Sequence, residues 1–172
     1  MPSELAEATV VLERTPRALD GLLRDLPESW THANEGPGTF SPFEVMGHLV
    51  HGEVDDWLPR VRIILETGGE FEPFDRFMHR VASKGKSTND LLVEFASLRV
   101  ANLKTLRRLD LGAEHLARTG MHPTLGPVSL SQLLAAWVVH DLSHIRQIAR
   151  VMAKRYGDSI GPWAEHMPVV SE

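Results

Sequence analysis

Two histidines near the C-terminal end, His140 and His144, have the type and spacing for metal or acid–base chemistry. They are four residues apart in a segment with helical periodicity, so both side chains project from one helix face. The same face carries the apolar residues Leu133, Trp137, Ile148 and Val151. We therefore expect both imidazoles to point into the protein, where they would bind a metal ion, form a buried polar network or transfer protons.

A metal ion held by two imidazoles alone would be weakly bound, so we expect a further ligand from another segment. The predicted helix at 42–67 carries Glu44, His48 and His51 along one meridian, opposite its apolar face. We expect this meridian to supply a third histidine ligand, His48 or His51, and its other polar side chains to line a solvent-filled approach, where Gly52 would leave space. Three imidazoles with one open coordination position are typical of a catalytic zinc site, although imidazole also binds nickel, copper and iron.

Glu44 has two candidate roles. It stands three residues after Ser41 in a capping box, with Pro42 at the first helical position, and this alone accounts for its presence. It also precedes His48 by one turn, so it could orient that ring or act as a catalytic proton acceptor. If it ligated the metal, the site would favour iron, manganese or nickel over zinc.

Residues around these segments have more ordinary expected roles. Asp141 and Gln147 flank the histidine pair. They could hydrogen-bond to the ligating histidines, or they could simply pack against another helix or face solvent. Trp57 and Trp137 are expected in the core, Arg146 in solvent, and Phe71, Phe74 and Phe77 against the bundle. The other histidines, His79, His115, His122 and His166, are expected at the surface, although His79 and His122 lie in connections that could close over the site.

Four amphipathic segments must position these residues. They span 3–26, 42–67, 88–109 and 129–156, with a break expected near Thr15 before Pro16 and a bend at Pro59. No segment reads convincingly as a strand, so we predict an all-α four-helix bundle forming a single domain over 1–172. Long connections at 68–86 and 110–128 join the second, third and fourth helices, and an irregular tail follows at about 158–172.

Composition excludes several classes of function. Of the 172 residues, 42% are hydrophobic and 24% charged, and the net charge of −5 with no dense Lys/Arg cluster argues against nucleic acid binding. No apolar run is long enough for a membrane span and no signal peptide is visible, so we expect a cytoplasmic protein. Without cysteine the chain has no thiolate ligand and no cysteine nucleophile, so any thiol would arrive on a substrate.

Two motifs resemble those of the DinB-like family of four-helix metal-binding proteins. They are Phe-Glu-Val-Met-Gly-His-Leu at 43–49, and Gly-Pro-Val-Ser-Leu at 126–130 leading into Trp-Val-Val-His-Asp-Leu-Ser-His-Ile-Arg-Gln-Ile at 137–148. The family includes YfiT-type hydrolases, bacillithiol transferases and the mycothiol-dependent maleylpyruvate isomerase. The resemblance implies that His48, His140 and His144 are the ligands of a divalent metal, which leaves His51 to line the approach to it. It also implies that the protein tends to dimerise.

These observations favour a metal-dependent enzyme acting on a small molecule, with zinc as the first candidate metal and nickel, iron or manganese as others. Both hydrolysis and transfer of a low-molecular-weight thiol fit such a site. The resemblance leads us to favour thiol transfer slightly. The alternatives are a metal-stabilised bundle without turnover, acting in sequestration or as an interaction module, and a metal-free binding domain.

Overall fold

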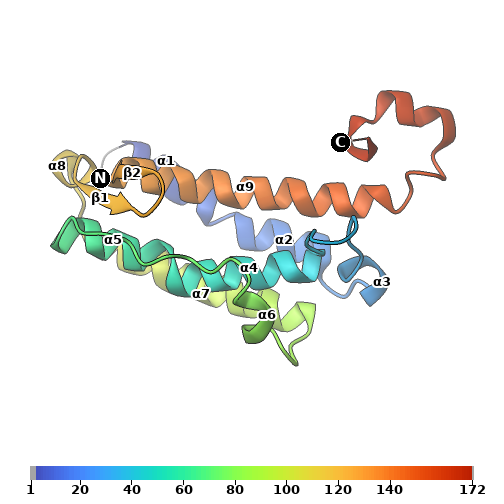
Figure 1. The fold of residues 1–172 in the computed structure, drawn as a ribbon, viewed down its shortest axis with the longest axis horizontal. Coiled ribbons are helices and arrows are strands. Elements are labelled where there is room, and N and C mark those ends of the chain that lie inside the picture. The colour runs from blue at the N-terminus through green and yellow to red at the C-terminus, as the bar shows by residue number, and fades with distance from the viewer. Residues whose placement is uncertain (1–2, 172) are drawn as a thin grey trace.

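The computed structural model describes residues 3–171, so residues 1, 2 and 172 of the predicted domain lie outside the described residues (Figure 1). Four helical rods run along the long axis of the molecule. The first contains α1 (Ser3–Leu12) and α2 (Thr15–Leu23), and the second contains α4 (Pro42–Asp55) and α5 (Trp57–Glu66). The third and fourth are the single helices α7 (Thr88–Arg108) and α9 (Leu130–Lys154). The predicted four-helix bundle is confirmed.

The first rod is broken where the sequence predicts it. Pro16 occupies the first turn of α2, where its missing N–H has no cost. Before it the chain leaves α1 in a turn in which the Arg14 N–H donates to the Val11 carbonyl over 2.9 Å. The break therefore follows from the proline, and it gives α2 its own N-terminus inside the bundle.

The second rod begins at a complete capping box. The Glu44 N–H donates to Ser41 Oγ over 3.2 Å, and the Ser41 N–H donates to Glu44 Oε2 over 3.0 Å. The bend predicted at Pro59 falls at Asp56, between α4 and α5. Because Pro59 has no N–H to donate to the carbonyl of Asp55, the helix is interrupted one turn before the proline.

Apolar side chains fill the bundle in two clusters. One includes the stacked rings of Trp57 and Trp137, with Phe71, and lies among α1, α5, α7 and α9. The other includes Met46 and Phe95 and lies among α2, α4, α7 and α9. Trp57 and Trp137 are therefore core residues, as predicted, and each long helix passes from one cluster to the other.

The expectation of no strand is wrong for the connection between α7 and α9. Strand β1 (Thr119–His122) pairs antiparallel with β2 (Gly126–Ser129), in the register Thr119 to Ser129. The Phe71 N–H also donates to the Met121 carbonyl over 2.8 Å, which ties the connection at 68–86 to this hairpin. Strands of four residues are too short to show an alternating pattern, so only the turn residues were visible in the sequence.

The remaining elements are short. They are α3 (Glu28–Thr31), α6 (His79–Ala82), α8 (Ala113–Leu116) and the 3-10 helices η1 (Gly161–His166) and η2 (Pro168–Val170). The predicted irregular tail thus contains two 3-10 turns, and it curls back above the C-terminal end of α9 (Figure 1). Between residues 3 and 171, no helix combines the length and the apolarity that crossing a bilayer requires.

Candidate metal centre

Helix α9 presents two histidines to the interior. Its N-cap is Ser129, whose Oγ accepts from the Gln132 N–H over 3.2 Å. Trp137 and Ile148 on its inner face are fully buried. His140 and His144 lie between these two residues on the same face, so their rings point toward α4, as predicted.

Helix α4 brings His48 opposite them. The sequence suggested that the polar meridian of this helix faces a solvent-filled funnel, and this holds only at its C-terminal end, where His51 and Asp55 line a groove. Every residue from Val45 to Glu53 is buried, because α6 and the connection before it cover the side of α4 that faces away from the core. His48 is only 7% exposed. Gly47 permits the close approach of α6, since a Cβ there would collide with Ser83 Oγ.

The three imidazoles converge through their Nε2 atoms. His140 Nε2 lies 3.1 Å from His48 Nε2 and 3.1 Å from His144 Nε2. One nitrogen of each ring lies within 4.8 Å of the other two. Nitrogens that share a zinc ion at about 2.1 Å are themselves about 3 to 3.5 Å apart. The spacing therefore fits three ligands of one cation.

The positions of the ring protons also favour a shared cation. His144 Nδ1 lies 2.9 Å from Gln147 Oε1, and because an amide oxygen only accepts, that nitrogen carries the ring proton. The lone pair of His144 Nε2 consequently faces His140. A single N–H at His140 can satisfy only one of the two nitrogens that approach it. A divalent cation would accept all three lone pairs, so the residues present fit such an ion.

Burial favours the neutral form of these rings. Burial, followed by the neighbouring imidazoles of His144 and His140, lowers the pKa of His48 from 6.5 to about 3. Burial likewise lowers the pKa of His144 from 6.5 to about 4, with His140 as the second cause. Both side chains are therefore neutral at pH 7, and neutral imidazole is the form that binds a metal.

Aromatic rings surround the cluster. The ring centroid of Trp57 lies 5.1 Å from that of His140, and the ring of Phe74 lies 5.6 Å from His48. His79, expected at the surface, is 1% exposed, and its ring lies 6.0 Å from His48. It is buried because α6 packs against α4, and a single histidine in a long connection gives no sign of this. His122 lies in β1, beside Phe71.

Three other positions singled out in the sequence, His51, Gly52 and Glu44, lie outside the cluster of three histidines. His51 Nδ1 lies 2.9 Å from Asp55 Oδ2, and its Nε2 lies 3.2 Å from the Asp75 carbonyl oxygen, so neither nitrogen joins the cluster. The space expected at Gly52 is filled, since a Cβ there would lie 3.3 Å from Trp57 Nε1. Glu44 caps α4, as predicted.

The second oxygen of Glu44 has a partner of its own. Glu44 Oε1 lies 3.2 Å from an Arg80 guanidinium nitrogen, while Oε2 accepts from the Ser41 N–H. The role of Glu44 as a proton acceptor is untested and stays a prediction.

A groove of about 420 Å³ opens beside the cluster. His51 and Phe74 form part of its wall, and their rings stack with centroids 4.5 Å apart. Because the ring of Phe74 also contacts His48, this side chain separates the groove from the three Nε2 atoms. The position of His51 beside the approach to the cluster agrees with the sequence-based expectation.

A buried charged network next to the histidines was missed. Arg99 donates to Glu53 Oε1 over 2.7 Å and to Asp141 Oδ2 over 2.6 Å, and all three side chains are at most 2% exposed. Trp137 Nε1 also donates to Glu53 Oε1 over 3.1 Å. Asp141 Oδ1 lies 4.0 Å from His140 Nδ1. A signal existed, because Arg99 sits on the apolar stripe of its helix between Phe95 and Leu103.

Comparison with known proteins places the fold. The model of the DinB superfamily matches residues 11–148, which is more than half of the chain. No curated protein sequence matches significantly.

Two solved structures are similar. YfiT from Bacillus subtilis, described as a probable metal-dependent hydrolase with an unusual four-helix bundle topology, is 20% identical with a TM-score of 0.76, over 90% of this chain and 89% of its own. TT2238, described as a four-helix bundle protein, is 22% identical with a TM-score of 0.60, over 84% of this chain and 98% of its own. At these identities the likeness establishes the shared bundle, whereas the match over 11–148 establishes the family. The chain therefore belongs to the DinB superfamily.

Proposed function

We propose that this protein is a metal-dependent enzyme that acts on a small molecule, with a divalent cation held by His48, His140 and His144. The observation that carries the proposal is the approach of His140 Nε2 to within 3.1 Å of both other Nε2 atoms. Zinc is the first candidate, and nickel, iron or manganese also suit imidazole ligands. When bound, such a cation supplies Lewis acidity, which favours the loss of a proton from a water or a thiol.

The protein's own residues orient and shield the site. Gln147 keeps the proton of His144 on Nδ1, so that Nε2 faces the cation. The rings of Trp57 and Phe74 lie against His140 and His48 and exclude bulk water from those sides. The groove beside His51 and Phe74 is the route by which a substrate would approach.

Hydrolysis is one candidate reaction, supported by the description of YfiT as a probable metal-dependent hydrolase. Transfer of a low-molecular-weight thiol is the second, and the partners of Glu44 favour it. Both oxygens of that carboxylate are engaged, by the Ser41 N–H and by Arg80, which leaves it poorly placed to take a proton from water. A thiol, with a pKa of about 8.5, needs such an acceptor less than water does. With no cysteine in the chain, the thiol would arrive as a substrate.

The same proposal includes a single domain over 1–172, a homodimer in solution and a cytoplasmic location. The competing function is a bundle that holds a metal without turnover, for sequestration or as an interaction module.

Turnover separates these functions. Protein loaded with zinc, nickel, iron or manganese is assayed on ester and amide substrates, and on glutathione with chlorodinitrobenzene as electrophile. We expect turnover in at least one assay, lost after chelation and in His140→Ala, and retained in His166→Ala, an exposed histidine of η1. Turnover that survives both chelation and His140→Ala would contradict the proposal. Metal binding without turnover in any assay would favour the non-catalytic bundle.

A further inference from the structure

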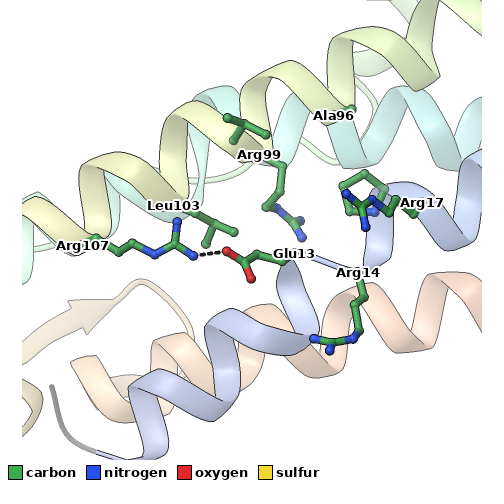
Figure 2. Close-up of a pocket in the computed structure, with 9 residues that line it drawn as sticks. Glu13, Arg14, Arg17, Ala96, Arg99, Leu103 and Arg107 are labelled. Atoms are coloured by element: carbon green, nitrogen blue, oxygen red, sulfur yellow. Dashed lines mark hydrogen bonds and ion pairs between the residues drawn. The ribbon is translucent and has the colours of Figure 1, made fainter.

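A second cavity lies away from the histidines, between the α1–α2 break and the middle of α7 (Figure 2). Its volume is about 560 Å³. The lining residues come from two rods only: Glu13, Arg14, Pro16, Arg17, Ala96, Arg99, Val100, Leu103 and Arg107. None of them belongs to the histidine cluster, and we call this cavity the arginine cleft.

The charge of the cleft is opposite to that of the whole chain. Four arginines and one glutamate line it, whereas the net charge of the protein is −5. Arg99 contributes no free charge, because Glu53 and Asp141 already bind it. Among the described residues, neither Arg14 nor Arg17 has a carboxylate partner. The cleft therefore carries positive charge that the protein itself does not neutralise.

Arg107 is held by an internal carboxylate. Figure 2 shows Glu13 directed toward Arg107, and the two side chains form an ion pair at the edge of the cleft. Both side chains are nearly half exposed, so this pair is weak and easily exchanged. An anion entering the cleft would compete with Glu13 for the Arg107 guanidinium.

The N-terminus of α2 adds to the positive potential. The helix begins at Thr15 in the wall of the cleft, its N-cap residue Arg14 makes no side-chain capping bond, and its first turn holds no acidic residue. The positive end of the helix dipole is thus uncompensated at the point where Arg17 enters the cleft. The helix break before Pro16 therefore places the positive end of α2 beside the arginines of the cleft.

Between Arg99 and Arg107, the α7 wall of the cleft is apolar. Val100 is 69% exposed on α7, next to the buried side chain of Leu103. An exposed valine inside a cavity is suited to contact an apolar group, while Arg107, two turns further along α7, is suited to an anionic one.

We propose that the arginine cleft binds a small organic anion, in which a phosphate or carboxylate group is joined to an apolar body. Arg107 binds the anionic group in place of Glu13, and Val100 on the same helix contacts the apolar body. Arg17 and the start of α2 add positive potential from the other end of the cleft. Glu13 acts as an internal competitor that sets the affinity.

Calorimetric titration of the full chain with phenyl phosphate, benzoate, inorganic phosphate and phenol tests this proposal. We expect phenyl phosphate or benzoate to bind more tightly than inorganic phosphate, and phenol not to bind. Whichever organic anion binds more tightly identifies the anionic group. Added salt should weaken binding, because the cleft lies at the surface.

Variants locate the binding. The double variant Arg17→Gln/Arg107→Gln should bind at least about tenfold more weakly, because it loses the charge-assisted contact of Arg107 and the positive charge of Arg17. The matched control Arg108→Gln, at the next residue of α7 and outside the cleft, should bind like the wild type. Glu13→Gln should bind a few times more tightly, and His140→Ala/His144→Ala should bind unchanged, which separates the cleft from the metal centre.

Two results would overturn the proposal. One is the absence of binding of either organic anion to the wild type at millimolar concentration. The other is equal affinity in the wild type and in Arg17→Gln/Arg107→Gln, once circular dichroism has shown that the double variant is folded.

Discussion

Two polar clusters lie side by side among α4, α7 and α9, and they are satisfied in different ways. Arg99 is surrounded by acceptors, namely Glu53, Asp141 and the Leu12 carbonyl at 2.9 Å. The histidine cluster brings together three groups of one kind, whose nitrogens have mainly each other as neighbours. The first cluster is complete within the chain. The second, in our proposal, is completed by a cation from outside the chain.

The comparison shows how a buried polar group can be assigned to structure or to function. Both polar clusters lie where the two apolar clusters of the core meet. Arg99 lies between Phe95 of one apolar cluster and Leu103 of the other, and the histidines of α9 lie between Trp137 and Ile148. Burial alone therefore does not distinguish them. What distinguishes them is that the Arg99 cluster has complementary charges, whereas the histidine cluster has nitrogen lone pairs without a donor. This difference can be tested by mutation.

The largest effect is expected for Arg99→Met. Removing the guanidinium leaves Glu53 and Asp141 buried without their counter-ion, which should cost about 3–5 kcal/mol of the free energy of unfolding. Urea denaturation of the metal-free protein measures this, with Arg108→Met as the exposed control. A loss below about 1 kcal/mol would show that the ion pairs of Arg99 are not needed to stabilise the fold.

The stability of the metal-free protein should fall as the pH decreases. The pKa values of His48 and His144 are lowered from 6.5 to about 3 and about 4, so below pH 6.5 the unfolded chain takes up protons that the folded chain does not. Unfolding therefore becomes easier, on the order of 2 kcal/mol for each of the two histidines between pH 7 and pH 5. Denaturation at several pH values should show a shallower dependence for His48→Gln. An identical dependence in wild type and variant would refute this explanation.

Gln147→Leu should weaken metal binding without greatly changing the stability of the metal-free protein. The substitution removes the acceptor that fixes the proton of His144 on Nδ1, and loss of such a partner typically lowers metal affinity about 10- to 100-fold. Competition with a chromogenic chelator measures the change. Unaltered affinity would mean that the ring of His144 is oriented by its packing alone.

The smallest effect is expected for Glu44→Ala. Loss of the capping box should cost about 1 kcal/mol of stability, while metal affinity stays within about twofold of the wild type. Thermal unfolding and a metal titration together test both parts. A large loss of metal affinity would instead place Glu44 among the ligands.

Much of the bundle could be predicted because helical signals are local. The capping boxes at Ser41 and Ser129 and the proline at position 16 mark element ends that the structure confirms. The hairpin at 119–129 could not be predicted, because its strands depend on pairing with each other and on contact with Phe71. Such contacts between distant segments leave no periodic pattern in the sequence.

The site was predictable in part for the same reason. The inward direction of His140 and His144 follows from the apolar stripe of one helix. The burial of His48 and His79 does not, because it depends on α6 covering α4. Arg99 could have been identified from its place on an apolar stripe, but its partners Glu53 and Asp141 lie on two other helices.

Metal content tests most directly whether the three histidines share a cation. After saturation with zinc and removal of unbound metal, elemental analysis should find about one ion per chain in the wild type and in His51→Ala. The double variant His140→Ala/His144→Ala, folded by circular dichroism, should retain almost none. Stoichiometric zinc retained by the double variant would contradict the account.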